Sequence, residues 1–394
     1  MTPQRSPSPV LLALALSMAA AVALGMTRFA YAMLLPIMRE DLSWSYTLAG
    51  AMNTANALGY LVGALSAPAL LRRWGAGRAV LIAAVGASAL MALSGFFRLA
   101  EPLLLQRLLA GVASAWLFVT AGLLTTQLAA GHPGKSGWLL GIYYGGTGWG
   151  IAASALVVPT VVAHGGHWPS AWWALALLCA GATAVLWRPA RVLSQAQAAA
   201  PGTPAATLPW RRSLPILAGY GCFGVGYIGY MTFVIALLRE QGLSESSRMV
   251  FYLVLGLAVV ASARIWARLL ERCREGQALA LLNALLGLAT LMAALSAQLW
   301  ALLLSGLLFG GVFLSVVAAT TAWVRHNLPP AQWAQGITVF TVVFAAGQVI
   351  GPTAVGSIAD SLGGPAGLSA GLIASAGMLW LGSALALLQQ PLER

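Results

Sequence analysis

The sequence predicts an all-α integral membrane protein, with twelve transmembrane helices in two parallel six-helix bundles related by a pseudo-twofold axis. Composition, the spacing of apolar segments and an internal repeat carry this prediction. Of the 394 residues, 60% are hydrophobic and 8% are charged, and the mean hydropathy is +0.84. Soluble domains carry about 25% charged residues. A surface so poor in charge requires lipid as its solvent.

Charged residues and Pro/Gly breaks divide the chain into twelve apolar segments. Each is long enough to cross a bilayer, which takes about 20 residues of helix. Each must be helical, because an open backbone in lipid leaves amide groups unpaired. The segments are 9–38, 46–71, 78–98, 102–129, 137–163 and 170–187, then 213–238, 247–269, 276–297, 299–324, 332–358 and 365–388.

The first segment also resembles a signal peptide, since Arg5 precedes an apolar run over 11–24 with small residues at 19–21. The apolar run, however, continues past Arg28 to Met38, which is long enough to span the membrane. We therefore expect an uncleaved first helix.

The one long break in the apolar chain covers 187–214. It carries four arginines and no acid, and its middle is Ala, Gln, Pro, Thr and Gly. Such a composition is typical of a flexible, solvated linker. The sequence therefore predicts an N-terminal six-helix bundle at 1–188, a cytoplasmic linker at 189–212 and a C-terminal six-helix bundle at 213–394.

The loop cations sort to one side of this arrangement. With the N-terminus inside, the other side receives only Arg39, Arg98, Arg239 and Arg248. The positive-inside rule then places both termini in the cytoplasm. The net charge of +12 does not indicate nucleic-acid binding, because the arginines are scattered in short loops. The cations on the inner side are Arg5, Arg72, Arg73, Arg78, Lys135, Arg188, Arg191, Arg211, Arg212, Arg268, Arg272, Arg274, Arg325 and Arg394.

The two halves resemble each other in sequence. An offset of 199 places 103–111 over 302–310, and an offset of 200 places Arg39-Glu40 over Arg239-Glu240. With six spans per repeat, both copies enter the membrane in the same orientation. The repeat therefore predicts parallel halves about an axis along the membrane normal.

Three arginines fall within the predicted spans, where a charge costs about 2.5–3.5 kcal/mol or more. Arg264 lies about one turn from Arg268, so we expect it to reach the interface. Arg28 lies about 15 Å below the end of its segment at 1.5 Å per residue. Arg107 lies about one and a half turns below its segment end. Either guanidinium suits a carboxylate or phosphate in a central cavity, or a permanent bond to carbonyls or polar side chains.

No carboxylate is expected at mid-membrane to carry a proton or to pair with Arg28. Either the substrate supplies the negative charge, or coupling runs through Asp360, Glu101 or a histidine near the outer face, His164 or His167. We therefore expect an anionic or partly anionic substrate. The nine acids all lie in loops or near helix ends: Glu40, Asp41, Glu101, Glu240, Glu245, Glu271, Glu275, Asp360 and Glu393.

Polar, aromatic and small residues complete the candidate sites. Such polar and aromatic residues also serve as packing or interface anchors, and small residues let helices pack closely with or without gating. The substrate or coupling candidates are Arg28, Tyr31, Asn53, Asn56, Arg107, Tyr143, Tyr144, Tyr227, Tyr230 and Gln348. The gating candidates are Gly146, Gly150, Gly347, Gly351 and Pro352.

Several stretches resemble motifs of the major facilitator superfamily, and the likeness covers nearly the whole chain. They are Leu105–Gly111, like the fourth-helix motif with its arginine; Gly146–Ala152 (GTGWGIA), like the glycine-rich fifth-helix motif; and Leu71–Arg78, like the loop between helices two and three. This loop departs from the pattern, since Pro68, Ala69 and Leu70 stand where the motif has an aspartate.

More narrowly, the chain is similar to the YbfB/YjiJ-type branch of that superfamily. The similar stretches are Gly25–Tyr31, Leu34–Met38 and Asn56–Gly63. The resemblance implies a secondary transporter of the bacterial inner membrane that works by alternating access and is driven by protons. It gives no firm substrate.

We therefore expect a monomeric carrier of a small organic solute, without cofactor or metal, with export favoured and import or uniport of small organic anions as the alternative. A membrane enzyme would need clustered acids, histidines or a nucleophile near a membrane face. A receptor would carry a soluble signalling domain, and no stretch here is long enough. The three cysteines lack the paired spacing of a metal site.

Overall fold

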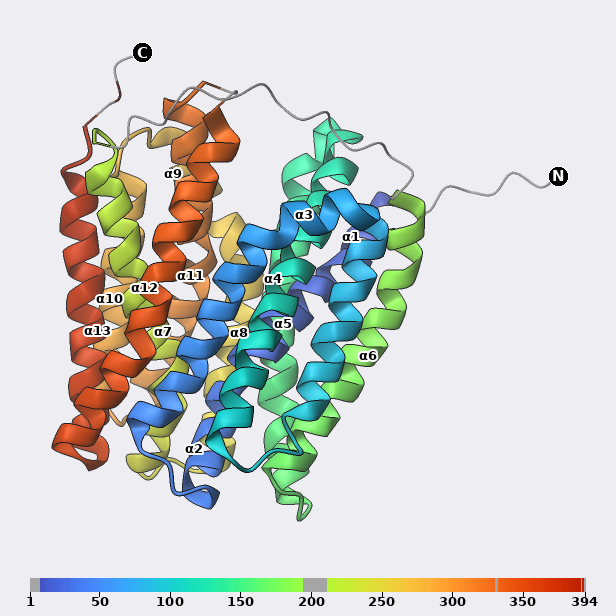
Figure 1. Cartoon of the computed structure of the whole chain (residues 1–394). Helices are drawn as coiled ribbons and strands as arrows, with labels where there is room; N and C mark the ends of the chain where they lie inside the picture. Colours follow the sequence, from blue (N-terminus) through green and yellow to red (C-terminus); the bar gives the residue numbers. More distant parts are fainter. Residues whose placement is uncertain (1–7, 194–210, 330–331, 391, 393–394) are drawn as a thin grey trace.

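The computed structural model describes residues 8–193, 211–329, 332–390 and 392, and all the regular elements in these ranges are helices (Figure 1). In the first half they are α1 (Pro9–Ala20), the π-helix η1 (Ala21–Phe29), α2 (Tyr31–Asp41), α3 (Tyr46–Leu93), α4 (Ala100–Ala130), the short 3₁₀ helix η2 (Pro133–Lys135), α5 (Ser136–Ala163) and α6 (Trp168–Leu193). In the second half they are α7 (Leu214–Glu240), α8 (Glu245–Ile265), α9 (Ala267–Arg272), α10 (Gln277–Leu295), α11 (Leu299–Asn327), α12 (Trp333–Leu362) and α13 (Gly364–Leu387).

Eleven helices in the described ranges are long and apolar enough to cross a membrane. One of them, α3, has 48 residues and contains two helices that meet at Gly75, where φ is 69° and ψ is 161°. Glycine adopts this positive φ without the steric cost that a side chain brings. Figure 1 shows α3 turning back at this point, so it crosses twice. The predicted all-α membrane fold with twelve crossings is confirmed.

The helices form two groups, the N half (8–193) and the C half (211–390), which stand side by side in Figure 1. Between the halves, α3 packs against α12, α5 against α8 and α2 against α7. Helix α6 continues to Leu193, five residues into the predicted linker at 189–212. Residues 194–210 of that linker lie outside the described residues, and its function as a tether stays a prediction.

The repeat seen in the sequence is also a repeat of contacts. Gly111 on α4 packs against the carbonyl of Asn56, and Gly310 on α11 packs against the carbonyl of Leu255, 199 residues later in both partners. A side chain at either glycine would meet backbone, so both helix pairs need glycine there.

A hydrogen bond recurs at the same offset of 199 residues. Gln106 Nε2 donates to the Leu90 carbonyl at 2.6 Å, and Ser305 Oγ donates to the Ala289 carbonyl at 2.6 Å. The two bundles therefore share one packing scheme.

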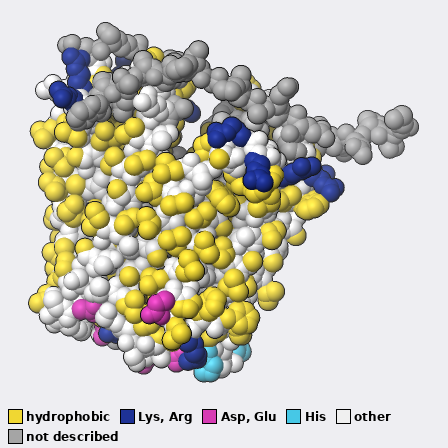
Figure 2. Space-filling model, in the orientation of Figure 1, with side chains coloured by type: hydrophobic (Ala, Val, Ile, Leu, Met, Phe, Trp, Pro, Cys, Tyr) yellow, Lys and Arg dark blue, Asp and Glu magenta, His cyan; other side chains and the backbone are white. Residues whose placement is uncertain are grey.

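Charge separates the two ends of the bundle. In Figure 2, Lys and Arg side chains gather at one end, and the Asp and Glu side chains visible on this face lie at the other, beside further Lys and Arg. We call these the basic end, where α3 turns at Gly75 and α6 finishes, and the opposite end. At the opposite end Arg98 pairs with Asp41 at 3.3 Å. Which end faces the cytoplasm stays a prediction at this point.

Candidate functional site

A cavity of about 410 Å³ lies between the two halves. Helix α9 and the last turn of α11 contribute Glu271, Arg325 and His326, so the cavity reaches the basic end. Seven of its lining residues are aromatic: Phe29, Tyr60, Phe118 and Tyr144 from the N half, and Tyr227, Phe313 and Phe344 from the C half. Its volume falls within the range of about 300–1,000 Å³ common for small-molecule sites.

Arg28 reaches this cavity from a π-helix. The wider turn is visible in the hydrogen bonds, since Ala30 N donates to the Gly25 carbonyl five residues earlier at 3.0 Å. The Thr27 hydroxyl likewise donates to the Val22 carbonyl at 2.6 Å. π-helical turns are rare and are often found at functional sites. Here the nine-residue segment carries Arg28, one of the two described arginines that line the cavity.

The Arg28 side chain is buried and its hydrogen-bonding capacity is largely unused. It is 2% exposed, and its Nε and Nη2 atoms have no hydrogen-bond partner among the described residues. Its guanidinium carbon lies 5.6 Å from the ring centroid of Tyr60 and 6.0 Å from that of Phe29. Unsatisfied buried donors cost about 1–3 kcal/mol each, and more when charged. An anion that accepted these two bonds would recover that cost.

Arg107 serves a different purpose. Its Nη1 donates to the Thr27 carbonyl at 2.9 Å, and its Nη2 donates to Asn53 Oδ1 at 3.2 Å. It is 3% exposed and does not line the cavity. Of the two roles considered for this arginine, the geometry favours the permanent bond to carbonyls.

The other carbonyl beside Arg28 is bound from the C half. The Tyr252 hydroxyl on α8 donates to the Phe29 carbonyl at 2.7 Å. The carbonyls of the residues before and after Arg28 are thus held, one by α4 of the same half and one by α8 of the other half. This arrangement fixes the segment that presents Arg28.

Of the ten substrate or coupling candidates, Arg28, Tyr144 and Tyr227 line the cavity. Gln348 lies outside the lining; it is 1% exposed and both of its amide atoms are unpartnered among the described residues. The remaining candidates make bonds within the protein: Tyr31 to the Ala49 carbonyl, Asn53 to Thr232, Asn56 to the Arg107 carbonyl, Tyr143 to the Phe118 carbonyl, and Tyr230 to Ser305. Their roles in transport stay predictions.

Four of the gating candidates pack inside one half. Gly146 and Gly150 on α5 pack against the backbone of Ser17 and Ala21, and Gly347 and Gly351 on α12 pack against the backbone of Gly221 and Val225. The carbonyl of Pro352 instead packs against Gly50 in the other half. Pro352 is therefore the candidate placed where the halves meet, and gating by any of the five stays a prediction.

The sequence analysis singled out Tyr227 but not Phe313 and Phe344, the rings that stack with it in the cavity wall. Tyr227 lies 5.5 Å from Phe313 with an interplanar angle of 16°, and 5.4 Å from Phe344 with an angle of 19°. Phe309 and Phe313, and Phe340 and Phe344, recur four residues apart, which places each pair on one helix face. That spacing was the available signal.

At the opposite end the halves are joined by polar contacts. Arg39 pairs with Glu240 at 3.9 Å, and Arg239 pairs with Glu40. The Tyr46 hydroxyl also donates to Glu240 Oε1 at 2.7 Å. We call these five residues the opposite-end cluster.

Asp360 on α12 reinforces this closure. Its carboxylate accepts from the backbone N–H groups of Tyr46 and Thr47 at 2.7 and 2.8 Å, at the start of α3. A carboxylate is favoured at a helix N-terminus. The halves are therefore in contact at the opposite end and separated by the cavity toward the basic end.

Comparison with known proteins agrees with this architecture. The family model described as "Uncharacterised MFS-type transporter YbfB" matches residues 20–387. No curated protein matches the chain.

Solved structures share the fold at low sequence identity. The nucleoside transporter NupG has a TM-score of 0.75 at 12% identity, over 96% of this chain and 98% of that one. A bacterial homologue of the human lysosomal transporter Spinster, in an inward-facing and unoccupied conformation, has a TM-score of 0.71 at 14% identity, over 98% and 99%. The human organic anion transporter MFSD10 (TETRAN) has a TM-score of 0.62 at 15% identity, over 96% and 98%.

Proposed function

Because the chain belongs to the YbfB-type family of major facilitator superfamily transporters, we propose that it carries a small organic anion across the bacterial inner membrane by alternating access. It is a multi-pass membrane transporter and not an enzyme. The substrate class, the direction, the driving ion, the monomeric state and the membrane are our proposal.

The observation that supports an anionic solute is the buried, unpartnered Arg28 in a cavity shared by both halves. Halves that rock about such a site expose it to one side at a time. The opposite-end cluster would open as the basic end closes. By the positive-inside rule, the basic end faces the cytoplasm together with both termini.

Export is the direction that the apolar walls favour. The neutral form of an apolar weak acid crosses lipid unaided, so a carrier for it serves mainly to remove it from the cell. Proton coupling is proposed from the resemblance to the superfamily. Our candidate for the proton-binding group is Asp360, because protonation would weaken the bonds that it accepts from Tyr46 and Thr47 across the two halves.

The test begins with purified full-length protein and a thermal-shift screen of small organic anions, cations and neutral amphiphiles. A ligand at 100 times its Kd stabilises the native state by about 2.7 kcal/mol. We expect anions to give the largest rises in Tm. Rises confined to cations or neutral compounds would refute an anionic solute.

The strongest ligand is then assayed in proteoliposomes for counterflow, with and without a pH gradient. A carrier exchanges labelled for unlabelled solute across the membrane, and a proton-coupled carrier accumulates it when a pH gradient is imposed. Binding without exchange would identify a receptor instead.

A further inference from the structure

We propose, on the basis of the transporter function above, that the solute is an aromatic monocarboxylate. Its carboxylate would lie on Arg28 of the N half, and its ring would lie against Tyr227, Phe313 and Phe344 of the C half. The solute would then bridge the two halves.

The first step concerns the charged group. Nε and Nη2, the two unpartnered atoms of Arg28, form one edge of the guanidinium. Two parallel N–H donors on that edge match the two oxygens of a planar carboxylate. The free donors therefore select a bidentate, planar acceptor.

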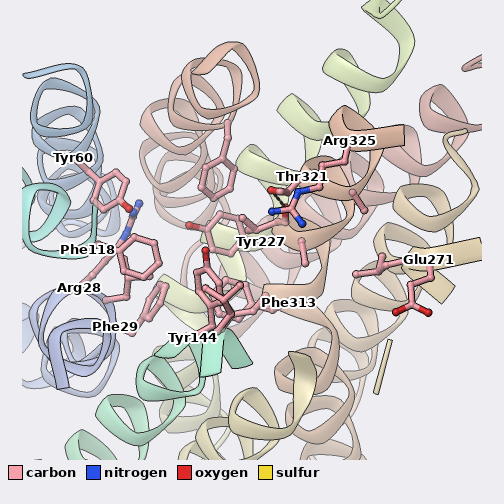
Figure 3. Close-up of a pocket in the computed structure, with 18 of the residues that line it drawn as sticks. Arg28, Phe29, Tyr60, Phe118, Tyr144, Tyr227, Glu271, Phe313, Thr321 and Arg325 are labelled. Atoms are coloured by element: carbon pink, nitrogen blue, oxygen red, sulfur yellow. Dashed lines mark hydrogen bonds between the residues drawn. The ribbon is translucent and has the colours of Figure 1, made fainter. Parts of the chain in front are cut away.

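The second step concerns the number of charges. Figure 3 shows Arg28 beside Tyr60 and Phe118 on one side of the cavity, with Arg325 and Glu271 on the other side. Arg28 is the one cation among the described lining residues on its side of the cavity, so a deep anion there has that guanidinium as its partner. A second negative group on the solute would be buried without a partner, which is costly.

The third step concerns the body of the solute. Tyr227, Phe313 and Phe344 form a nearly parallel set of rings, and Phe29 of the N half meets Phe313 edge-on at 5.6 Å and 85°. Aromatic pairs gain energy beyond their buried area in stacked or edge-on geometry. Figure 3 shows Tyr227 and Phe313 in the middle of the cavity, within reach of a ring whose carboxylate lies on Arg28.

The walls also disfavour a polyhydroxylated solute. Among the described lining residues, Thr321 is the one aliphatic hydroxyl, and the other polar groups are the three tyrosines and the charged or imidazole groups. A sugar-like body would leave hydroxyls buried without hydrogen bonds, which costs free energy.

The experiment measures binding of naphthalene-2-carboxylate to the full-length protein by calorimetry. The comparison ligands are the neutral naphthalene-2-carboxamide, naphthalene-2,6-dicarboxylate and the saturated decahydronaphthalene-2-carboxylate. We expect the monocarboxylate to bind at least about tenfold more tightly than the amide or the dicarboxylate, as expected for one charge-assisted hydrogen bond or more. We expect the saturated acid to bind severalfold more weakly.

Variants locate the interaction. Arg28→Gln should bind the carboxylate and the amide equally. Arg28→Lys should keep a reduced preference for the carboxylate, because lysine keeps the positive charge but lacks the two parallel N–H donors of the guanidinium. The control is Arg268→Gln, an exposed cation of α9 at the basic end that does not line the cavity. It should bind like the unaltered protein.

Equal binding of the carboxylate and the amide by unaltered protein would overturn the proposal. So would a carboxylate preference that survives in Arg28→Gln, or a saturated acid that binds as tightly as the aromatic one. Counterflow of the same probe separates the two proposals. Arg28-dependent binding without exchange would refute transport alone, and exchange of the amide at equal rate would refute the substrate class alone.

Discussion

The N half and the C half share one set of helix contacts but differ at the residues around the cavity. Gly111 and Gly310 make equivalent close approaches, and Gln106 and Ser305 make equivalent hydrogen bonds. One position later the halves diverge, since Arg107 aligns with Gly306. The contacts that the two halves share fix the helix packing, and the positions at which the halves differ create the site.

The divergence extends to the first helix of each half. In the N half the first crossing is interrupted by the π-helix η1, and Arg107 binds the Thr27 carbonyl within it. In the C half, α7 is one uninterrupted helix, and the space above Gly306 is filled by the ring of Phe251. The N half thus contributes the buried Arg28, and the C half contributes most of the stacked ring surface.

The largest effect is expected at the close glycine contacts that both halves share. Gly111→Val and Gly310→Val should each prevent accumulation of folded protein, because the new side chain would enter backbone of the neighbouring helix. Overpacking costs about 1–3 kcal/mol even where side chains can yield. Monodisperse yield and Tm in detergent are the readouts, with Gly377→Val as the control, since no neighbouring atom lies within 4 Å of that position. If only one of the two valine variants lost yield and Tm, the two contacts would not be equivalent.

A smaller effect is expected where the halves differ. Arg107→Met should weaken naphthalene-2-carboxylate binding about tenfold to a hundredfold, since hydrogen bonds from a charged group contribute about 1.5–3 kcal/mol. Without the bond to the Thr27 carbonyl, η1 is no longer held in the position that directs Arg28 into the cavity. Gln106→Met removes the neighbouring bond to α3 and should lower Tm without changing affinity. Equal affinity losses in both variants would mean that Arg107 acts only on stability.

The bond that joins the halves beside Arg28 should contribute less. Tyr252→Phe removes a neutral hydrogen bond to the Phe29 carbonyl, worth about 0.5–1.5 kcal/mol, so affinity should fall about twofold to tenfold. Tyr230→Phe is the matched control, because its hydroxyl bonds to Ser305 inside the C half. An equally large loss of affinity in Tyr230→Phe would show that the Tyr252 hydroxyl has no specific role in binding.

The smallest effect is expected at the opposite-end cluster, where the halves are alike again. Glu40→Gln and Glu240→Gln each weaken one of two reciprocal ion pairs whose side chains are 33–69% exposed. Exposed pairs contribute about 0.2–1 kcal/mol. Each variant should therefore raise the population open at this end by about fivefold or less.

Spin labels on Ser43→Cys and Ser246→Cys, in a background free of the native cysteines, would report this opening as longer interlabel distances. Similar shifts in both variants are expected from the repeat of Arg39-Glu40 and Arg239-Glu240. A shift confined to one variant would show that the two pairs are unequal.

The fold was predictable because apolar segments of this length have no stable alternative to helix in lipid. Arg28 could be identified as a candidate because its distance from the end of its apolar segment places it near the middle of the membrane. The bonds of Arg107 could not, because nothing in residues 21–29 distinguishes a π-helix from an α-helix before the carbonyl of Thr27 is located. The spacing of Phe313 and Phe344 from Phe309 and Phe340 indicated shared helix faces, but not that these faces line a cavity, since such a pair looks the same in a packed core.

The most direct test is an experimental density map of the protein saturated with naphthalene-2-carboxylate. We expect the carboxylate within hydrogen-bond distance of Arg28 Nε and Nη2, with the rings against Tyr227 and Phe313. Density for the ligand beside Arg325 at the basic end, or an Arg28 side chain bonded to protein and turned away from the cavity, would contradict the account.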